Sequence, residues 1–293
     1  MSEEPVDYIR KVYCVVNCGK NIFAQSVRHF LEECGIPFEE RGERCLHFPE
    51  RGVCLILVPI DAFDIESDFD APESDTIYLY EDRWVYRNDL MKKRILARLG
   101  VFRSLFARKC RIIDDSQIKA DSRKNLKIKD FLELYHSYGD ARCKYRYALE
   151  YDGDIVAVAT FSSPRPMPRC TDEGSVIVYD SYEWVRYASL PDCRVIGGMG
   201  RLLKAFISDI TVKNSKGRRP VEVMTYADLE WSAGEVYSRL GFKLVQKREP
   251  VEFLVNQETF ERIASNKFEA KRESSQDFVK IKNLGSLKYL YQM

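Results

Sequence analysis

The sequence predicts an α/β protein with mixed sheets, divided into two domains. Its 293 residues exceed the usual size of one domain, and its apolar content of 45% is that of an ordinary globular protein. Short apolar runs typical of strands alternate with stretches whose apolar residues recur at helical spacing. We place the domain boundary so that the domains span residues 1–105 and 106–293.

The first domain is expected to begin with a strand over 11–16, followed by a helix over 21–33. The apolar residues of this helix recur at helical spacing, and Gly35 ends it. The wholly apolar run at 53–59 suits a buried strand, and residues 77–80 form another. This order predicts a small sheet with one covering helix.

The second domain is expected to contain more elements, and a turn signal at Asp152-Gly153 marks a hairpin of the type I′ kind. The expected elements are a strand over 109–113, a helix over 127–136, the hairpin strands 144–151 and 154–163, a stiff basic loop over 165–169, a strand over 182–188, a helix after glycines 197–200, a strand over 220–228, a short helix after 231, a strand ending near 245, and two closing strands in the tail.

The glycine turn before the apolar helix is the most informative feature of the chain. Glycines before a helix leave backbone N–H groups bare at its N-terminus, where an anion is bound favourably. Glycines also turn and cap chains for structural reasons alone, which is the alternative interpretation. If the turn binds a phosphate, the residues that hold it are Gly197, Gly198, Met199, Gly200 and Arg201.

This glycine turn, the strand over 220–228 and the helix and strand after it resemble the second half of the GNAT acyltransferase fold. In that family the pyrophosphate of coenzyme A lies on the glycine loop, so the resemblance implies acetyl-CoA or a related acyl-CoA as cofactor. The family loop reads Gln/Arg-x-x-Gly-x-Gly/Ala. Gly198 and Gly200 fit it, but Val195 stands at its first position, and reading one residue earlier puts Arg194 there with Met199 at the final small position.

Three residues are candidates for acyl-transfer chemistry, which needs a base for the nucleophile and a proton for the leaving sulfur. The resemblance implies that Tyr237 is the acid; the alternative is a tyrosine packed on the core. Asp228 either holds or deprotonates an amine, or caps the following helix. Glu183 either acts as a base through a water or pairs with Arg186 along its strand.

A narrower resemblance covers roughly residues 20–293. The runs 77–84, 93–100 and 107–111, with the later blocks Glu183-x-x-Arg186, Tyr-Ala-Asp228, Trp231-Ser-x-Gly and Gly285-x-x-Lys288, are similar to phage-associated homing-endonuclease-like proteins. In that group a nuclease-like domain of the PD-(D/E)xK type precedes a GNAT-like domain. The C-terminal half is also similar to phage Mom-type DNA modification proteins. The resemblance implies a phage or mobile-element protein with DNA as a possible partner.

The nuclease chemistry of that group needs an acid on one strand and an acid-x-lysine on the next, which together hold Mg²⁺. In this sequence the two acids would fall near Cys45 and Ile56, and neither position is acidic. We therefore expect a nuclease-like domain without a metal site. The alternative is a metal-dependent endonuclease that uses Asp61 and Asp64 instead.

The net charge of +1 conceals a sharp division. Nine acidic residues and no Lys or Arg lie from Asp61 to Asp82, whereas nine basic residues and one acid lie from Arg87 to Arg111. We expect the basic run to form an amphipathic helix whose basic face contacts nucleic-acid phosphates. The alternative is a solvated face paired with the acidic stretch. The candidate contacts are Lys92, Lys93, Arg94, Arg98 and Arg108.

The remaining composition favours a cytoplasmic protein. Nine cysteines lack repeated zinc-type pairs, no apolar run is long enough to cross a membrane, and the N-terminus lacks the order of a signal peptide. The leading hypothesis is a GNAT-like N-acyltransferase without a metal. Nucleic acid is one candidate for the acceptor of its acyl group. The alternative is a non-catalytic DNA-binding protein built from two degenerate enzyme folds.

Overall fold

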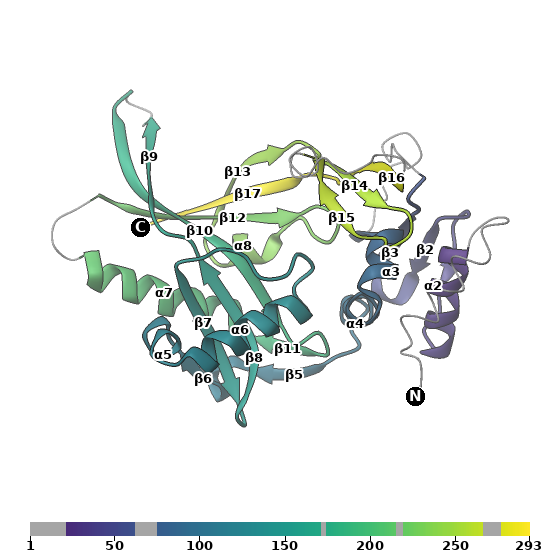
Figure 1. Cartoon of the computed structure of the whole chain (residues 1–293), viewed down its shortest axis with the longest axis horizontal. Coiled ribbons are helices and arrows are strands. Elements are labelled where there is room, and N and C mark those ends of the chain that lie inside the picture. Colours follow the sequence, from purple (N-terminus) through teal and green to yellow (C-terminus); the bar gives the residue numbers. More distant parts are fainter. Residues whose placement is uncertain (1–21, 62–74, 171–173, 215–218, 266–276) are drawn as a thin grey trace. The chain divides into compact units, whose positions relative to one another are not determined.

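The computed structural model describes residues 22–61, 75–170, 174–214, 219–265 and 277–293 (Figure 1). The chain forms two compact units. The first unit consists of residues 1–95, 228–233 and 247–286, and the second of 96–227, 234–246 and 287–293. Two segments that we assigned to the second domain, 228–233 and 247–286, therefore belong to the first unit. The strand predicted over 11–16 and Asp64 lie outside the described residues.

The first unit contains two sheets and three α-helices among its described residues. The four-stranded sheet has the order β1-β2-β3-β4, with β3 and β4 parallel, and the three-stranded sheet has the order β15-β14-β16. The predicted helix over 21–33, its end at Gly35 with φ of 66°, and the strands over 53–59 and 77–80 are confirmed. The elements are α2 (Ile22–Glu33), β1 (Glu39–Glu40), β2 (Cys45–Phe48), β3 (Val53–Val58), β4 (Asp75–Tyr80), α3 (Glu81–Tyr86), α4 (Asn88–Arg98), β14 (Glu252–Asn256), β15 (Arg262–Ala264) and β16 (Phe278–Lys282).

The basic run does not form one long helix, so the prediction over 87–111 is wrong beyond Arg98. Gly100 adopts a φ of 86°, and the last turn closes through bonds from the N–H of Gly100 to the carbonyl of Ala97 and from the N–H of Val101 to that of Leu96. This is the left-handed helix end that glycine permits. The chain then continues as β5 (Arg103–Phe106) and the 3₁₀ turn η2 (Ala107–Lys109).

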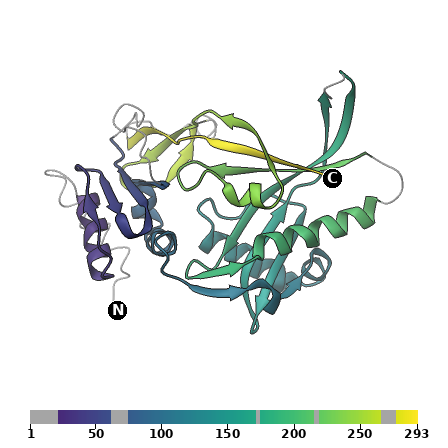
Figure 2. The same cartoon turned by 180° about the vertical axis from the view of Figure 1, so that it is seen from behind.

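The second unit is built on a large sheet with the strand order β13-β17-β12-β10-β8-β7-β6. Helix α7 packs on one face through its Leu202, Leu203, Phe206 and Ile210, and helices α5 and α6 pack on the other, as the two opposite views show (Figures 1 and 2). The elements are β6 (Arg111–Ile113), α5 (Asp115–Lys119), α6 (Ser122–Tyr135), β7 (Tyr145–Tyr151), β8 (Asp154–Phe161), β9 (Arg165–Cys170), β10 (Val176–Ser189), β11 (Cys193–Ile196), α7 (Gly198–Asn214), β12 (Val221–Asp228), α8 (Glu235–Arg239), β13 (Lys243–Arg248) and β17 (Ser286–Gln292).

Most expected elements of this unit are confirmed, including the hairpin β7–β8, whose turn has positive φ at Asp152 (52°) and Gly153 (88°). The stiff loop predicted over 165–169 is wrong, because these residues form strand β9 paired antiparallel with β10. Pro166 and Pro168 alternate along β9, and proline is tolerated there because β9 is an edge strand.

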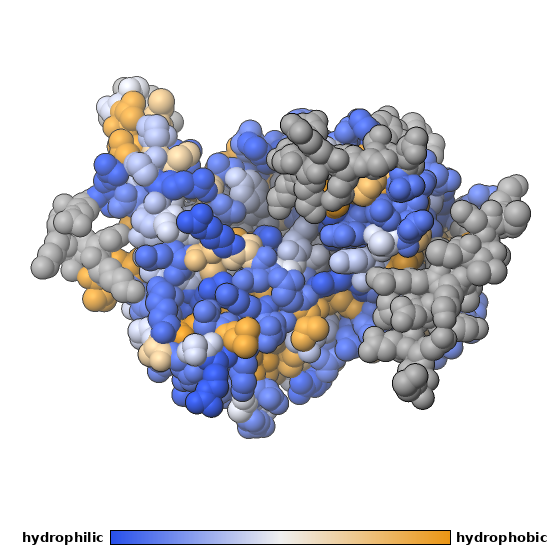
Figure 3. Space-filling model, in the orientation of Figure 1, coloured by the Kyte–Doolittle hydropathy of each residue, from blue (hydrophilic) through white to orange (hydrophobic). Residues whose placement is uncertain are grey.

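The hairpin β9–β10 carries apolar side chains toward its free end, visible as an apolar patch in the space-filling view (Figure 3). Val176, Ile177 and Val178 are 61%, 38% and 36% exposed. The sequence prediction missed this exposure, because consecutive apolar residues in a strand usually indicate burial on both faces.

Candidate active site

The two central parallel strands of the second unit separate part of the way along their length. β10 and β12 pair over four positions, Asp180–Glu183 with Val221–Met224. Both strands continue, to Ser189 and Asp228, with no further pairing between them in these fully described segments. The gap therefore opens at the carboxyl ends of two parallel strands, where ligands bind in open α/β sheets.

Two local features accompany this separation. The ladder between β10 and β8 shifts register between Trp184 and Arg186, and such an irregularity bends a strand. At the start of the gap, the Thr225 hydroxyl donates to the carbonyl of Trp184 at 3.3 Å. The sequence did not indicate the register shift or the contact between Thr225 and Trp184, because a strand that changes its partners has the same local residue pattern as one that keeps them.

The glycine turn follows β10 through the short strand β11, and helix α7 begins at Gly198. Within the described residues, the N–H groups of Gly198, Met199 and Gly200 have no backbone acceptor, and the first helical bond runs from the N–H of Arg201 to the carbonyl of Gly197 at 3.0 Å. The predicted residues thus lie together on one turn. They present three N–H groups of the kind that binds an anion.

The same glycines are also required by packing. Gly197 has a φ of 78°, which an L-residue adopts at a cost of about 1–2 kcal/mol. A Cβ on Gly198 would lie 2.9 Å from the Tyr187 hydroxyl, and one on Gly200 would lie 3.1 Å from Leu240 Cδ2. The structural and the functional interpretation of the turn are therefore both consistent with its geometry.

Tyr237 lies on α8 in an aromatic cluster of the same unit. Its ring centroid is 6.0 Å from that of Trp184, 5.8 Å from that of Phe242 and 5.5 Å from that of Tyr289. Burial raises the pKa of Tyr237, while a hydrogen bond with Thr225 acts to lower it. The phenol therefore holds its proton at neutral pH beside the start of the gap between β10 and β12, as a general acid must.

Glu183 occupies the last position of β10 that pairs with β12, next to Trp184. Adjacent residues of a strand point to opposite faces of the sheet, so Glu183 points away from the face that carries Trp184 and Tyr237. Its carboxylate accepts from the Arg165 guanidinium at 3.3 Å, whereas the expected partner, Arg186, donates to the carbonyls of Gly139 and Val185. Arg165 is thus the partner that the sequence did not indicate.

Asp228 ends β12, and its contacts place it in the first unit. Its Oδ1 accepts from the N–H of Glu230 at 3.0 Å, and its carbonyl accepts from the N–H groups of Trp231 and Ser232. These bonds stabilise the turn after the strand, as in the capping interpretation. A role for Asp228 toward an amine stays a prediction.

The candidate nucleic-acid residues of α4 are only in part exposed. Lys92 Nζ lies 5.3 Å from the ring centroid of Phe30, and the Arg94 guanidinium lies 4.0 Å from that of Trp231. Lys93 is exposed, whereas Arg98 is half-buried; the fifth candidate, Arg108, lies on η2 and is exposed. The basic side chains of α4 therefore do not form one continuous exposed face. Contact with nucleic acid stays a prediction.

The first unit places the two positions expected for nuclease acids directly opposite each other, since Cys45 pairs with Ile56 across β2 and β3. Burial and the neighbouring Cys54 raise the pKa of the Cys45 thiol to about 11. Among the described residues, no group of three His, Cys, Asp or Glu side chains is arranged to hold a metal ion. Asp61 is exposed and lies three residues after the end of β3.

Searches of known proteins connect the chain with acetyltransferases only by distant structural likeness. No protein-family model matches the chain, and no curated protein does. A GNAT family acetyltransferase from Elizabethkingia anophelis with acetyl-CoA bound is 15% identical, with a TM-score of 0.33. The Bacillus subtilis acetyltransferase in complex with CoA is 12% identical with a TM-score of 0.32, and the ribosomal-protein-alanine N-acetyltransferase from Brucella melitensis is 13% identical with a TM-score of 0.30.

Each of these three similarities covers 63% of this chain and 99% of the other chain. No helix within the described ranges is long and apolar enough to cross a membrane. The nuclease-like character of the first unit and the relation to Mom-type proteins stay predictions. What the chain shares with the solved structures is a distant likeness to the GNAT acetyltransferase fold over about 63% of its length.

Proposed function

We propose that the second unit is an acyl-CoA-dependent N-acyltransferase. The observation that carries this proposal is the separation of β10 and β12 after Glu183 and Met224, beside a helix whose first N–H groups have no backbone acceptor. In this proposal the thioester arm lies where the two strands are no longer paired, and the pyrophosphate lies on the bare N–H groups of the glycine turn. The proposal places the predicted coenzyme, acetyl-CoA or a related acyl-CoA, at this position.

The reaction would proceed by attack of an acceptor amine on the thioester carbonyl. The new C–N bond would form as the C–S bond breaks, with the Tyr237 phenol giving a proton to the leaving thiolate and Glu183 taking the amine proton through a water. Solvent would then return a proton from Glu183 to Tyr237, so that both side chains regain their starting state. The opposite directions of Glu183 and Tyr237 from the sheet suit this arrangement, because acceptor and leaving thiol then approach from opposite faces. Acetyl-CoA is the first donor to test.

The coenzyme site is tested by Gly198→Asp, which adds a carboxylate to the turn that would receive the pyrophosphate. Calorimetry with acetyl-CoA should show binding to the parent and a loss of at least about tenfold in affinity for the variant, which corresponds to about 1.4 kcal/mol. Gly198→Ala is the matched control, because it adds the same Cβ near Tyr187 without the charge.

The roles of coenzyme and acid are then separated by Tyr237→Phe. This variant should bind acetyl-CoA like the parent and lose most of its turnover, since the phenol is needed only when the thiolate leaves. If the parent binds no acetyl-CoA at millimolar ligand, the acyltransferase proposal is wrong, and the non-catalytic DNA-binding alternative becomes the leading one.

A further inference from the structure

A small parallel sheet beside the glycine turn presents an exposed apolar platform. β11 pairs with β5 in register, with Val195 opposite Leu105 and Ile196 opposite Phe106. Leu105 and Val195 are buried, whereas Phe106 and Ile196 are 44% and 41% exposed. Ile196 directly precedes Gly197, and a planar ring can stack on the exposed pair of Phe106 and Ile196.

Positive charge borders this platform. The Arg108 guanidinium lies 4.9 Å from the ring centroid of Phe106, and both Arg108 and Lys109 are exposed. The neighbouring cations along the chain are paired, Arg103 with Asp192 and Arg111 with Glu150. Within the described ranges, Arg108 and Lys109 form no ion pair.

Contacts tie this segment to the glycine turn. The Arg201 guanidinium donates to the carbonyl of Ala107, and the Cβ of Ala107 lies 3.9 Å from where a Cβ on Gly197 would stand. The platform and its cations are thus fixed against the first turn of α7. A group covalently joined to an anion on that turn would lie within their reach.

We propose that Phe106 and Arg108 form a subsite for the 3′-phosphoadenosine half of the coenzyme, with the adenine on Phe106 and Ile196 and the 3′-phosphate on Arg108 and Lys109. This inference rests on the proposed function, because it requires the pyrophosphate on the glycine turn. It selects the free nucleotide coenzyme as acyl donor over a phosphopantetheine arm carried by a protein, which lacks the adenosine and its phosphate.

The test compares CoA with dephospho-CoA, which lacks only the 3′-phosphate, and with pantetheine, which lacks the nucleotide. The full-length parent should bind dephospho-CoA about tenfold more weakly than CoA, as expected for one charge-assisted contact. Arg108→Gln should lower the affinity for CoA toward that for dephospho-CoA, with Lys109 still in place, and leave the affinity for dephospho-CoA unchanged. Phe106→Ser should weaken both nucleotides equally and leave pantetheine unaffected.

Arg111→Gln is the matched control, because Arg111 is an exposed arginine already bound to Glu150, and it should preserve the ratio between CoA and dephospho-CoA. Equal binding of CoA and dephospho-CoA by the parent would overturn the subsite while leaving the proposed function intact. If Arg108→Gln leaves the ratio of CoA to dephospho-CoA affinity unchanged but abolishes binding of duplex DNA, Arg108 contacts nucleic acid rather than the coenzyme. Failure of the parent to bind any CoA would refute the proposed function itself.

Discussion

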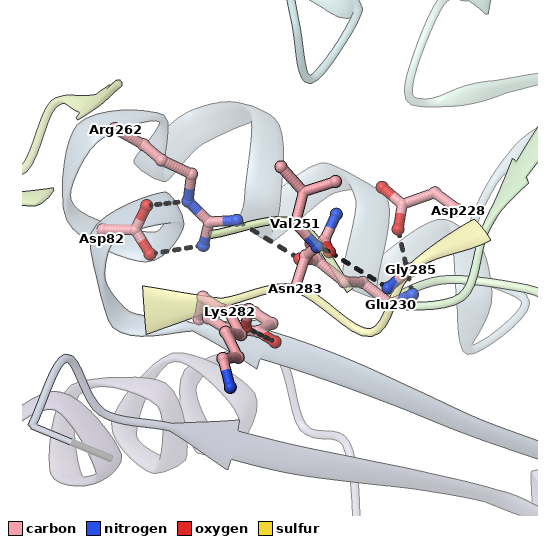
Figure 4. A network of polar contacts seen from close by, with 9 residues as sticks. Asp82, Asp228, Glu230, Val251, Arg262, Lys282, Asn283 and Gly285 are labelled. Carbon is pink, nitrogen blue, oxygen red and sulfur yellow. Dashed lines mark hydrogen bonds and ion pairs between the residues drawn. The ribbon is translucent and has the colours of Figure 1, made fainter. Parts of the chain in front are cut away.

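Arg262 is a fully buried cation held by two buried carboxylates of the first unit (Figure 4). Its guanidinium forms two bonds to Asp82, at 2.7 and 2.8 Å, and one to Glu230 at 3.3 Å. The rings of Tyr80 and Phe253 lie 4.6 and 5.3 Å from it. The buried Arg262 guanidinium thus faces two buried carboxyl groups, and such a cluster is stable only while its members remain paired.

Burial shifts the protonation of Glu230. Together with the neighbouring Asp228 and Asp82 it raises the pKa of this carboxyl to about 7, against the lowering effect of Arg262 and Arg83. The unfolded chain releases this proton near pH 4.3. The folded state therefore binds more protons between about pH 4.3 and 7, and the stability that this proton contributes is present below that window and lost as pH rises through it.

Glu230→Gln replaces the protonated acid by a neutral side chain of the same shape, and it tests this linkage. The free energy of unfolding of the parent, relative to that of the variant, should fall between pH 5 and pH 8 in denaturant titrations. Glu252→Gln, which removes an exposed partner of Lys280, is the control and should change stability by no more than about 1 kcal/mol at both pH values. A variant that loses more stability at pH 8 than at pH 5 would show that Arg262 keeps Glu230 ionised.

At the scale of elements, local signals predicted most strands and helices. The wholly apolar run of β3, the Asp152-Gly153 turn and the glycines before α7 act through nearest neighbours, and all appear as expected. The prediction failed where the outcome depends on distant pairing. Nothing local shows that β9 finds β10, or that β10 and β12 separate after four residue positions.

For the candidate site, the sequence predicted the glycine turn at Gly198, and the resemblance to the GNAT fold implied Tyr237 as the acid; the roles of both residues stay predictions. The partner of Glu183 did not follow, because Arg165 lies on a strand that the sequence indicated as a loop. Side-chain pairing across a sheet depends on strand register, which a single sequence leaves open.

Helix α4 leads to a changed prediction about nucleic acid. Lys92 and Arg94 lie over aromatic rings, so Lys93 is the exposed one of the three adjacent cations. If α4 contacts duplex DNA, Lys93→Gln should reduce the slope of log affinity against log salt by about 0.9, the value for one phosphate. Replacing all three by Gln should add little to this change.

The triple replacement should instead lower the melting temperature, because each lost contact between a cation and a ring costs about 0.5–1 kcal/mol or more. If the triple variant instead reduces the salt slope by about three times the value for one phosphate, Lys92 and Arg94 leave their rings to contact DNA. An unchanged slope in every variant would leave α4 without a role in nucleic-acid binding.

For the whole molecule, the path of the chain decides which fragments can fold. The core of the first unit joins Ile56, Val58 and Tyr80 to Val255 and Ile281, whose exposed fractions are 0% and 1%. Tyr80 also donates its hydroxyl to the carbonyl of Lys282 at 2.8 Å. A cut near residue 96 would therefore divide one hydrophobic core between two fragments.

Expression of residues 96–293 alone tests this arrangement. The fragment keeps every strand of the large sheet and the glycine turn, so it should still bind acetyl-CoA if the parent does. Its residues 247–286 lose the apolar partners of Val255 and Ile281 and the carboxylate of Asp82 beside Arg262, so proteases should cleave within this segment first and a hydrophobic dye should bind. The full-length chain under the same conditions is the control. A fragment as resistant to proteolysis as the full chain would show that residues 247–286 fold without the first 95 residues, as the predicted boundary between residues 105 and 106 implies.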